Sequence, residues 1–568
     1  LKIMIPIAMP TLITITILKL MGSWNAYVWP TMVTQSEDMR LISNGLRNSF
    51  SDSEGRSTQG RQMAAATAVL APLLIMFIFL RKYIKQFCFR NINLKNKKGE
   101  FTKMKKLNKI ALFLLLVICG VVATGCGGGN DDDRIEIEYW HANGAALTTV
   151  LEEIKADFEA KNPDYKVKLV SYGDYNTLRD TITSAIAGGI APTAAQTYPD
   201  HISLYLEGEA LQSLDKYIND PVNGMSKEEQ AQFIEGFWAE GTIYDTAGTR
   251  YGMPFNKSTE LMYYNADIFA KYGWEVPKTW DEVIEVAEAY KKTTEYAEAI
   301  KANPGKVYAL GYDSEANLFI TLTQQYGAVY TSFDANGKGI YNAFGAVEAD
   351  VLKSKASMNW YLEEFKKGNI ATSTAFGTDY CSDAFKAGQC IMTIGSSAGA
   401  TYNDGQAATG VKFTTGVSAV PQKDLENGQV IQQGTNVSLF KCSDAKEELG
   451  GWLWLKHMVS YESALKWALE TSYFPIRYDV LNSEEYQNHI KGNIIADDGS
   501  VVEGIQTLAA KAKEAGLAQS QWFYTNVAFP GSSKARDNAE TIVQQILYGD
   551  SMTVDKAYTD AYNSIMND

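Results

Sequence analysis

Histidine is scarce in this sequence, and the motifs of several large enzyme classes are missing. The 568 residues contain only four histidines, His141, His201, His457 and His489. They lie far apart, with no cysteine or carboxylate at ligand spacing, which argues against a metal site. No Walker phosphate-binding loop and no dinucleotide-binding fingerprint occurs. We therefore expect no metal and no cofactor.

Cysteine is also sparse, with six residues in the whole chain. Three of them, Cys381, Cys390 and Cys442, fall in the long C-terminal part. Cys381 and Cys390 are close enough in sequence to bridge a loop. Because three is an odd number, at least one of these thiols stays free.

The net charge of −14 is the sum of a positively charged N-terminal part and a negatively charged C-terminal part. Residues 1–125 hold 17 Lys and Arg against 5 Asp and Glu, a net +12, so the remaining 443 residues carry −26. An acidic surface of this size repels phosphate backbones, which excludes nucleic acid as the expected partner of the larger part. A chain of this length should hold several folding units.

Two long uncharged runs lie in the basic part. They are residues 3–18 and 63–80, and the second is followed at once by the basic cluster 81–85. Each run is near the length of ~20 residues that crosses a bilayer. The basic cluster is expected on the cytoplasmic side, which places the polar segment 22–62 outside. We predict two transmembrane helices in 1–85. The alternative is that one or both runs are buried helices of a soluble domain.

A third apolar run has the plan of a signal peptide. Lys105, Lys106 and Lys109 precede the apolar stretch 110–123, which ends at Thr124-Gly125-Cys126. This order resembles the lipobox of bacterial lipoproteins, which implies that 104–125 is removed and that Cys126 is acylated. Residues 126–133 would then tether a domain to the cell membrane on its extracytoplasmic side. The alternative is an uncleaved signal anchor with an incidental cysteine.

A signal peptide that begins at residue 104 indicates that something has been fused upstream of it. Residues 1–85 resemble the C-terminal end of ABC sugar-transporter permeases, on the segments 23–33 and 61–87. Residues 86–103 have no apolar periodicity, and Lys98-Gly99-Glu100 can be encoded by a ribosome-binding sequence. We interpret 86–103 as a linker, either translated intergenic DNA between adjacent genes or part of a genuine fusion.

From Arg134 onward, strand and helix patterns alternate. Residues 135–140 and 165–172 read as strands on either side of a helix at 148–162. Further strands are predicted at 307–311, 390–394 and 437–440, and further helices at 280–292, 442–458 and 535–548. Thr279 precedes two acids, as at a helix start. Such alternation predicts an α/β fold, and 443 residues are too many for one core, so we expect two lobes.

The order of motifs here resembles the extracellular solute-binding proteins that deliver sugars and glycerol-3-phosphate to ABC transporters. The most specific piece is 251–283, with support from 185–192, 384–399, 432–440 and 471–477. The resemblance implies a two-lobed periplasmic-binding-protein fold of type II, with a hinge and a ligand cleft between the lobes. It assigns 134–253 and 416–457 to lobe 1, and 254–415 and 458–568 to lobe 2.

Within that family, the glycerol-3-phosphate-binding type is the most similar, and it implies a set of ligand-binding residues. The matching positions are Tyr175, Ser258, Ser397, Gly434, Tyr473 and Arg536. Where that type presents a glutamate to the glycerol hydroxyls, this chain reads Tyr-Pro-Asp, and we substitute Asp200. The departure leaves the exact ligand open.

The chemistry of these residues suits a polyol phosphate. Asp200 can accept hydrogen bonds from two hydroxyls, and Arg536 offers a planar fork for two oxygens of a phosphate or carboxylate. Without the resemblance, Arg536 reads first as an ordinary surface arginine at a helix start. A neutral sugar would instead need an aromatic platform, for which the candidates, each also a candidate for the core, are Trp140, Trp238, Trp274 and Trp522.

We therefore predict a non-enzymatic, lipid-anchored binding protein of an ABC importer. Its ligand would be glycerol-3-phosphate or a related polyol or sugar, and its partners the permease subunits and the membrane. One alternative is an oligosaccharide-specific member of the same family. Another, of a different class, is a surface-anchored glycan hydrolase or adhesin, which the same anchor and the aromatic content would also suit. If the ligand is an anion, this acidic domain has to recruit it through a local arginine, against its own overall charge.

Overall fold

The computed structural model describes residues 134–408, 410–495, 501–550 and 552–566. These residues belong to a compact unit that begins at Asp133. The predicted membrane spans, the linker, the signal peptide and Cys126 all lie outside the described residues. In the described ranges, no helix is long and apolar enough to cross a membrane.

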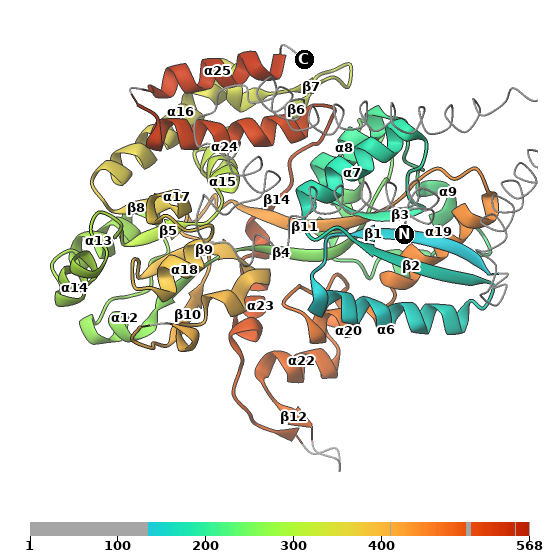
Figure 1. Ribbon diagram of the computed structural model, residues 1–568, viewed down its shortest axis with the longest axis horizontal. Coiled ribbons are helices and arrows are strands. Elements are labelled where there is room, and N and C mark those ends of the chain that lie inside the picture. Colours follow the sequence, from blue (N-terminus) through green and yellow to red (C-terminus); the bar gives the residue numbers. More distant parts are fainter. Residues whose placement is uncertain (1–133, 409, 496–500, 551, 567–568) are drawn as a thin grey trace, which may run out of the picture. The chain divides into compact units, whose positions relative to one another are not determined.

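A mixed ten-stranded sheet runs through this unit (Figure 1). Its main path is β2-β1-β3-β11-β4-β9-β5-β8, with β10 paired to β4 and β14 paired to β11. Parallel strands occupy both ends, and the antiparallel strands β11 and β4 cross the middle. The strands are β1 (Ile135–His141), β2 (Tyr165–Ser171), β3 (Ala194–Thr197), β4 (Met253–Asn265), β5 (Leu310–Tyr312), β8 (Ile370–Thr372), β9 (Met392–Ser396), β10 (Thr415–Ser418), β11 (Val430–Leu439) and β14 (Phe523–Tyr524).

Helices cover both ends of the sheet (Figure 1). Those before β4 are α6 (Ala145–Lys161), α7 (Tyr175–Gly188), α8 (Pro199–Glu207), α9 (Asp215–Ile218), α10 (Lys227–Gln230), α11 (Glu235–Ala239) and the 3-10 turn η2 (Glu240–Thr242). Those between β4 and β11 are α12 (Ala266–Tyr272), α13 (Trp280–Tyr290), α14 (Thr294–Ala302), α15 (Glu315–Gln325), α16 (Glu348–Lys366), α17 (Ser373–Phe376) and α18 (Cys381–Lys386). Those after β11 are α19 (Ala445–Met458), α20 (Tyr461–Glu470), α21 (Tyr478–Leu481), α22 (Glu484–Lys491), α23 (Leu508–Ala518), α24 (Ser532–Tyr548) and α25 (Val554–Met566).

Local sequence signals account for several of these elements. The side chain of Thr279 accepts a hydrogen bond from the Glu282 backbone N–H, and the Glu282 carboxylate accepts from the Thr279 N–H, so a capping box starts α13. The predictions of strands at 135–140 and 165–172, of the helix between them and of the helix at 280–292 are confirmed. The predicted strand at 437–440 is only the end of β11, whose first half carries glutamines and lacks an apolar pattern.

Two large hydrophobic cores lie on either side of the β4–β11 pair. We call them the first core, which includes Ile137, Leu151, Trp454 and Trp467, and the second core, which includes Trp280, Phe319, Tyr361 and Ile542. β4 contributes Met253 and Phe255 to the first core and Met262 to the second. The two strands therefore connect the two cores.

The packing departs from the predicted lobe boundaries at both ends of the segment 416–457. β10 pairs with the end of β4, and Val420 and Val430 join the second core, although 416–430 was assigned to lobe 1. Helices α20 to α22 join the first core, although they were assigned to lobe 2. The reason is that α20 follows α19 after a short turn and packs Trp467 against Phe255, with ring centroids 4.6 Å apart.

The cysteines of the described region are all free thiols. Cys381 and Cys390 are both buried, and they do not form the loop-bridging disulfide that their spacing allowed. Burial raises the pKa of the Cys381 thiol. These two thiols therefore act as small apolar core residues.

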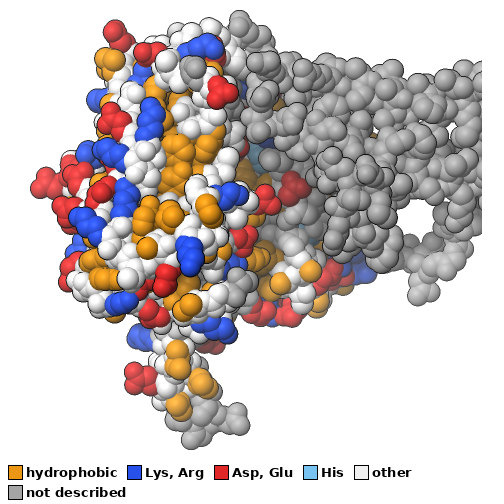
Figure 2. All heavy atoms as spheres, turned by 60° about the vertical axis from the view of Figure 1, so that its left-hand side comes forward, with side chains coloured by type: hydrophobic (Ala, Val, Ile, Leu, Met, Phe, Trp, Pro, Cys, Tyr) orange, Lys and Arg blue, Asp and Glu red, His pale blue; other side chains and the backbone are white. Residues whose placement is uncertain are grey.

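Two minor hairpins stand apart from the main sheet. One consists of β6 (Ser332–Phe333) and β7 (Gly339–Ile340), and the other of β12 (Ile494–Ile495) and β13 (Val501–Val502). The second hairpin projects from the body beyond α22 (Figure 1), and apolar side chains lie on its surface (Figure 2). Ile494, Val501 and Val502 are each at least half exposed.

Candidate ligand-binding cleft

A cavity of about 320 Å³ lies beside the β4–β11 pair, between the two cores. One wall comes from α7, α8 and η2. The buried residues of α7 and α8 form a smaller hydrophobic cluster with Trp140 of β1, at the same end of the sheet as the first core. The opposite wall comes from α15 and α24, which belong with the second core, and from the segment 524–528. The floor is formed by residues 431–434 of β11. We call this cavity the cleft, and its walls the first-core wall and the second-core wall.

Four of the seven predicted ligand residues line the cleft: Tyr175, Asp200, Gly434 and Arg536. Ser258, Ser397 and Tyr473 are not among its lining residues and lie one layer behind. The Ser397 hydroxyl accepts a hydrogen bond of 3.1 Å from the Thr259 N–H, and Ser258 is buried within β4. Tyr473 lies beside the lining residue Tyr175, and the two hydroxyls interact electrostatically.

Tyr175 starts α7, directly after Asp174, whose side chain caps the helix. Its ring lies edge-on to Tyr198, with centroids 4.8 Å apart. Its hydroxyl lies near Tyr473, Asn256 and Gln196, and burial raises its pKa. Tyr175 is therefore a neutral group in a fixed orientation.

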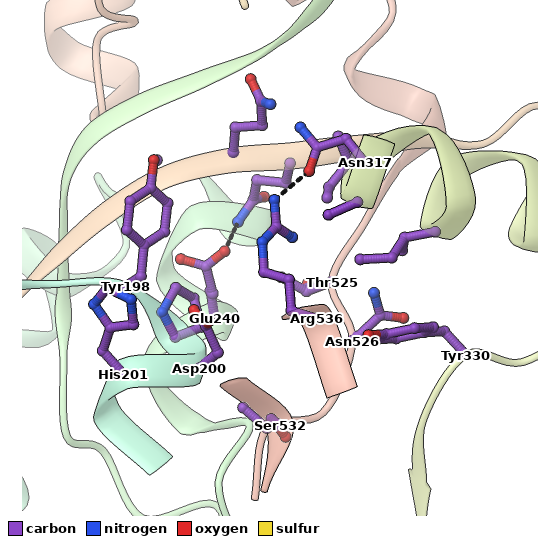
Figure 3. A pocket seen from close by; sticks show the side chains of 18 of the residues that line it. Tyr198, Asp200, His201, Glu240, Asn317, Tyr330, Thr525, Asn526, Ser532 and Arg536 are labelled. Carbon is purple, nitrogen blue, oxygen red and sulfur yellow. Dashed lines mark hydrogen bonds between the residues drawn. The ribbon is translucent and has the colours of Figure 1, made fainter. Parts of the chain in front are cut away.

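Asp200 lies in the first turn of α8, directly after Pro199 at the first helical position. Both features favour a helix start here, because proline fixes φ and an acid suits the positive end of the helix dipole. Asp200 and its neighbour His201 lie on the first-core wall (Figure 3). Burial lowers the pKa of His201, so the ring is neutral near pH 7.

Gly434 sits where β11 passes closest to β4. Its φ is +106°, and an added Cβ would lie 1.8 Å from the carbonyl oxygen of Asn256. The register of the two strands also shifts between Gly434 and Asn436. Only glycine permits this approach, so Gly434 shapes the floor of the cleft.

Arg536 extends from α24 into the cleft and donates a hydrogen bond to the Asn317 side-chain oxygen (Figure 3). The Asn317 amide in turn donates to the Glu260 carboxylate at 2.9 Å. Within the described part of the chain, no carboxylate lies at ion-pair distance from the Arg536 guanidinium. Its charge is therefore available to a ligand.

Glu240 is a lining residue that the sequence analysis missed. It extends from η2 into the same space as Arg536 (Figure 3). Its carboxylate accepts hydrogen bonds from Lys257, from Gln432 at 2.9 Å and from Asn436 at 3.0 Å. No motif marks Glu240, but Lys257, which closely follows the apolar run 253–255, was a usable signal, because a buried ammonium needs an anionic partner.

The remaining charged groups of the cleft are Arg179, Asp537 and Glu540. Arg179 already pairs with Asp180 at 2.9 Å and donates to the Ser533 hydroxyl at 3.3 Å. Burial raises the pKa of Asp537 and of Glu540. Two lining residues keep a buried polar atom without a partner in the described structure, namely Gln433 through its side-chain oxygen and Tyr330 through its hydroxyl.

Tyrosines, not tryptophans, provide the aromatic surface of the cleft. The four candidate platforms Trp140, Trp238, Trp274 and Trp522 are absent from its lining. Trp238 instead stacks on Phe233 and under the Arg250 guanidinium, and Trp274 packs on Phe269 and Tyr272. The aromatic residues that line the cleft are Tyr175, Tyr198, Tyr330 and Tyr524.

The segment 395–399 reads Gly-Ser-Ser-Ala-Gly and matches the spacing of a serine-hydrolase nucleophile motif. Its serine, Ser397, is fully buried, and its hydroxyl is bonded to the Thr259 N–H. None of the histidines of the described region forms a hydrogen bond with it. This match therefore has no catalytic geometry.

Comparison with known proteins supplies a family. The model of the bacterial extracellular solute-binding protein family matches residues 153–492. Similar curated proteins include the sn-glycerol-3-phosphate-binding periplasmic protein UgpB of Escherichia coli (strain K12), 27% identical over 372 residues, and that of Shigella dysenteriae, 26% identical over 374. Each of these alignments covers 63% of this chain and 78% of the relative.

Solved structures share the fold. UgpB from Mycobacterium tuberculosis in complex with glycerophosphocholine has a TM-score of 0.59 at 15% identity, and covers 76% of this chain and 98% of its own. A substrate-binding protein from Listeria monocytogenes in complex with cycloalternan has a TM-score of 0.57 at 20% identity, and covers 77% and 99%. At these identities the likeness concerns the fold alone.

Proposed function

The chain belongs to the bacterial extracellular solute-binding proteins, and we propose that its cleft captures an anionic polyol of the glycerol-3-phosphate or glycerophosphodiester class. Membership makes it a non-enzymatic, substrate-binding component of an ABC importer that works outside the cytoplasm. The proposal concerns which ligand it carries and which residues hold that ligand.

The proposal rests mainly on the orientation of Arg536 and on its lack of an ion-pair partner among the described residues. Its guanidinium faces the cleft, its hydrogen-bond partner there is the neutral Asn317 side chain, and it forms no ion pair with a described carboxylate. A guanidinium in a sheltered cleft gains most from an anion that accepts two parallel hydrogen bonds. A phosphate group meets that need.

The opposite wall suits hydroxyl groups. Asp200 and Glu240 present carboxylate oxygens that accept hydrogen bonds, and the free atoms of Gln433 and Tyr330 offer further partners. Leaving a buried polar group unpaired costs about 1–3 kcal/mol, so a ligand with several hydroxyls is favoured over an apolar one. A cavity of about 320 Å³ suits a small ligand.

A second candidate ligand is a short neutral oligosaccharide. The four tyrosines of the cleft favour it, because aromatic rings offer flat apolar surface together with a polar edge. Such a ligand would leave the charge of Arg536 without an anionic partner. For this reason we rank it below the anionic polyols.

Calorimetry on the full chain separates the two classes. We expect heat from glycerophosphocholine and glycerol-3-phosphate, and none or weak heat from maltotriose. Arg536→Ala should weaken binding of the anions about 30-fold or more, corresponding to ~2 kcal/mol. A matched control is Lys556→Ala, which removes one positive charge from the neighbouring helix α25 and should leave affinity unchanged. Equal affinity of wild type and Arg536→Ala for every anion would refute the proposal.

We propose further that Cys126 carries a lipid anchor that holds the binding domain at the cell membrane, and that 1–85 derives from a permease. Support comes from the lipobox-like order of 104–126 and from the role of ABC permeases as partners of this family. Metabolic labelling with a radioactive fatty acid should label the wild type and not Cys126→Ser. Equal labelling of both would reject the anchor.

A further inference from the structure

One buried carboxylate lies behind the cleft rather than in it. Glu260, in β4, is 1% exposed and is not a lining residue. Its carboxylate accepts hydrogen bonds from the Tyr312 hydroxyl and, at 2.9 Å, from the Asn317 amide. In the described part of the chain no lysine or arginine contacts it directly. A buried carboxylate without a cationic contact is costly to keep ionised.

The same asparagine connects Glu260 to the ligand site. Asn317 gives its amide N–H to Glu260 and receives a hydrogen bond on its oxygen from Arg536. Glu260 and Arg536 are therefore separated by a single side chain, and their charges interact. The charge state of Glu260 therefore depends on the charge of Arg536.

We propose that Glu260 is a proton-binding site coupled to the cleft, so that an anion bound at Arg536 is taken up together with one proton from solvent. The ligand part of this proposal depends on the proposed function, because it requires an anionic ligand. The coupling between Glu260 and Arg536 does not.

The charges around Glu260 explain the coupling. The groups that face it come from β5 (Tyr312, followed by Asp313), α15 (Asn317), β14 (Tyr524) and α24 (Arg536). Burial raises the pKa of Glu260 to about 7, while the hydrogen bonds and the positive charge of Arg536 oppose that rise. The pKa of Glu260 therefore lies close to neutral pH, where a small change of nearby charge alters its protonation.

Binding of an anion changes one of the two influences on the pKa of Glu260, namely the positive charge of Arg536. An anion on Arg536 cancels its positive charge, which removes a force that keeps Glu260 ionised, so Glu260 takes up a proton. By thermodynamic reciprocity, protonation of Glu260 then strengthens anion binding. The affinity for an anion should therefore rise as pH falls through neutrality, and the affinity for a neutral sugar should not.

Glycerophosphocholine is a suitable probe, because its phosphodiester carries one negative charge throughout this pH range. Calorimetry of the full chain at pH 7, in buffers of different ionisation enthalpy, counts the protons taken up on binding. We expect a substantial fraction of one proton in the wild type, and an affinity that rises roughly three- to tenfold from pH 8 to pH 6.

The matched variant is Glu260→Gln, which keeps the shape. Its side-chain oxygen can accept from the Asn317 amide, and its NH2 group can donate to the Tyr312 hydroxyl, so that contact is kept with its direction reversed. It should show proton uptake near zero and a flat affinity over the same range. Asp537→Asn is the control for the other acids near Arg536, and it should keep the part of the uptake that belongs to Glu260. Equal uptake by wild type and Glu260→Gln would overturn the proposal.

A second measurement needs no ligand. In the full chain labelled with ¹³C at glutamate carboxyls, the Glu260 resonance, assigned through Glu260→Gln, should titrate near neutral pH. Arg536→Gln should move that midpoint to higher pH, because it removes the opposing positive charge. An unchanged midpoint would overturn the coupling whether or not glycerophosphocholine binds. A shifted midpoint without glycerophosphocholine binding would uphold the coupling and reject the anionic ligand instead.

Discussion

The two walls of the cleft hold their acids in opposite ways. On the first-core wall, Glu240 contacts the ammonium of Lys257 directly and accepts from two side-chain amides. Behind the second-core wall, Glu260 has only neutral donors, and the nearest cation, Arg536, reaches it through Asn317. Lys257 and Glu260 are three residues apart in β4, so one strand supplies both arrangements.

This difference separates a fixed charge from an adjustable one. A carboxylate in contact with a buried ammonium forms a neutral pair, which changes little when a ligand binds. A carboxylate held only by neutral donors is sensitive to any change of charge nearby. The first-core wall therefore offers constant acceptors to hydroxyls, whereas the second-core wall responds to the charge of the ligand.

The largest expected effect comes from breaking the fixed pair. Lys257→Met leaves the Glu240 carboxylate buried without its cation, and should lower the free energy of unfolding by about 3–5 kcal/mol. The double variant Lys257→Met/Glu240→Gln should recover most of that loss, because it removes both charges. Denaturant unfolding measures both. If the double variant is no more stable than Lys257→Met, the pair does not stabilise the wall in this way.

A smaller effect is expected where the strands of the two walls meet. Gly434→Ala places a Cβ against the Asn256 carbonyl at a φ of +106° and should cost about 2–3 kcal/mol. Gly144→Ala is the control, because a Cβ there meets nothing within 4 Å and its φ is −70°. Thermal unfolding of both variants tests this difference. Equal stabilities would mean that β11 can move away from β4 without cost.

The smallest effect concerns a second buried lysine, Lys513. Its ammonium contacts a backbone carbonyl, whereas that of Lys257 contacts a carboxylate. Lys513, in α23, is fully buried, and its ammonium donates to the Ala468 carbonyl oxygen. Burial lowers the pKa of Lys513 to about 8, below the value of about 10.4 in an unfolded chain. The unfolded state therefore binds more protons between these values, and the cost of burying the charge is fully present below pH 8.

Lys513→Met should thus stabilise the protein at pH 7, by about 1 kcal/mol after the lost hydrogen bond is allowed for. The gain should shrink as pH rises from 8 toward 10.5. Urea unfolding at pH 6.5 and pH 9.5 measures it. A loss of stability at pH 6.5, as expected for Lys257→Met, would show that the two buried lysines do not differ as described.

Sequence reasoning succeeded where the signal is local. The capping box at Thr279 and the alternating pattern of 135–140 each lie within a few residues, and both elements form as predicted. The packing of α20 departs from the predicted lobe boundary at 457, because Trp467 packs against Phe255, which is far away in sequence. Packing between distant segments leaves no local pattern.

The same division holds for the site. Tyr175, Asp200, Gly434 and Arg536 were proposed from family resemblance, and the fold brings them to one cleft. Glu240 and Asn317 were not predicted, because the sequence around them carries no motif. Their roles arise from contacts of Glu240 with Lys257 and of Asn317 with Glu260. Both partners are charged residues within a buried strand, which is the signal that would have led to them.

The most direct test of the central claim is a crystal structure of the chain with glycerophosphocholine bound. The account predicts that phosphate oxygens lie about 2.7–2.9 Å from the Arg536 guanidinium, with the glycerol hydroxyls directed toward Asp200 and Glu240. A ligand whose phosphate lies away from Arg536, or hydroxyls that leave both carboxylates without a contact, would contradict it.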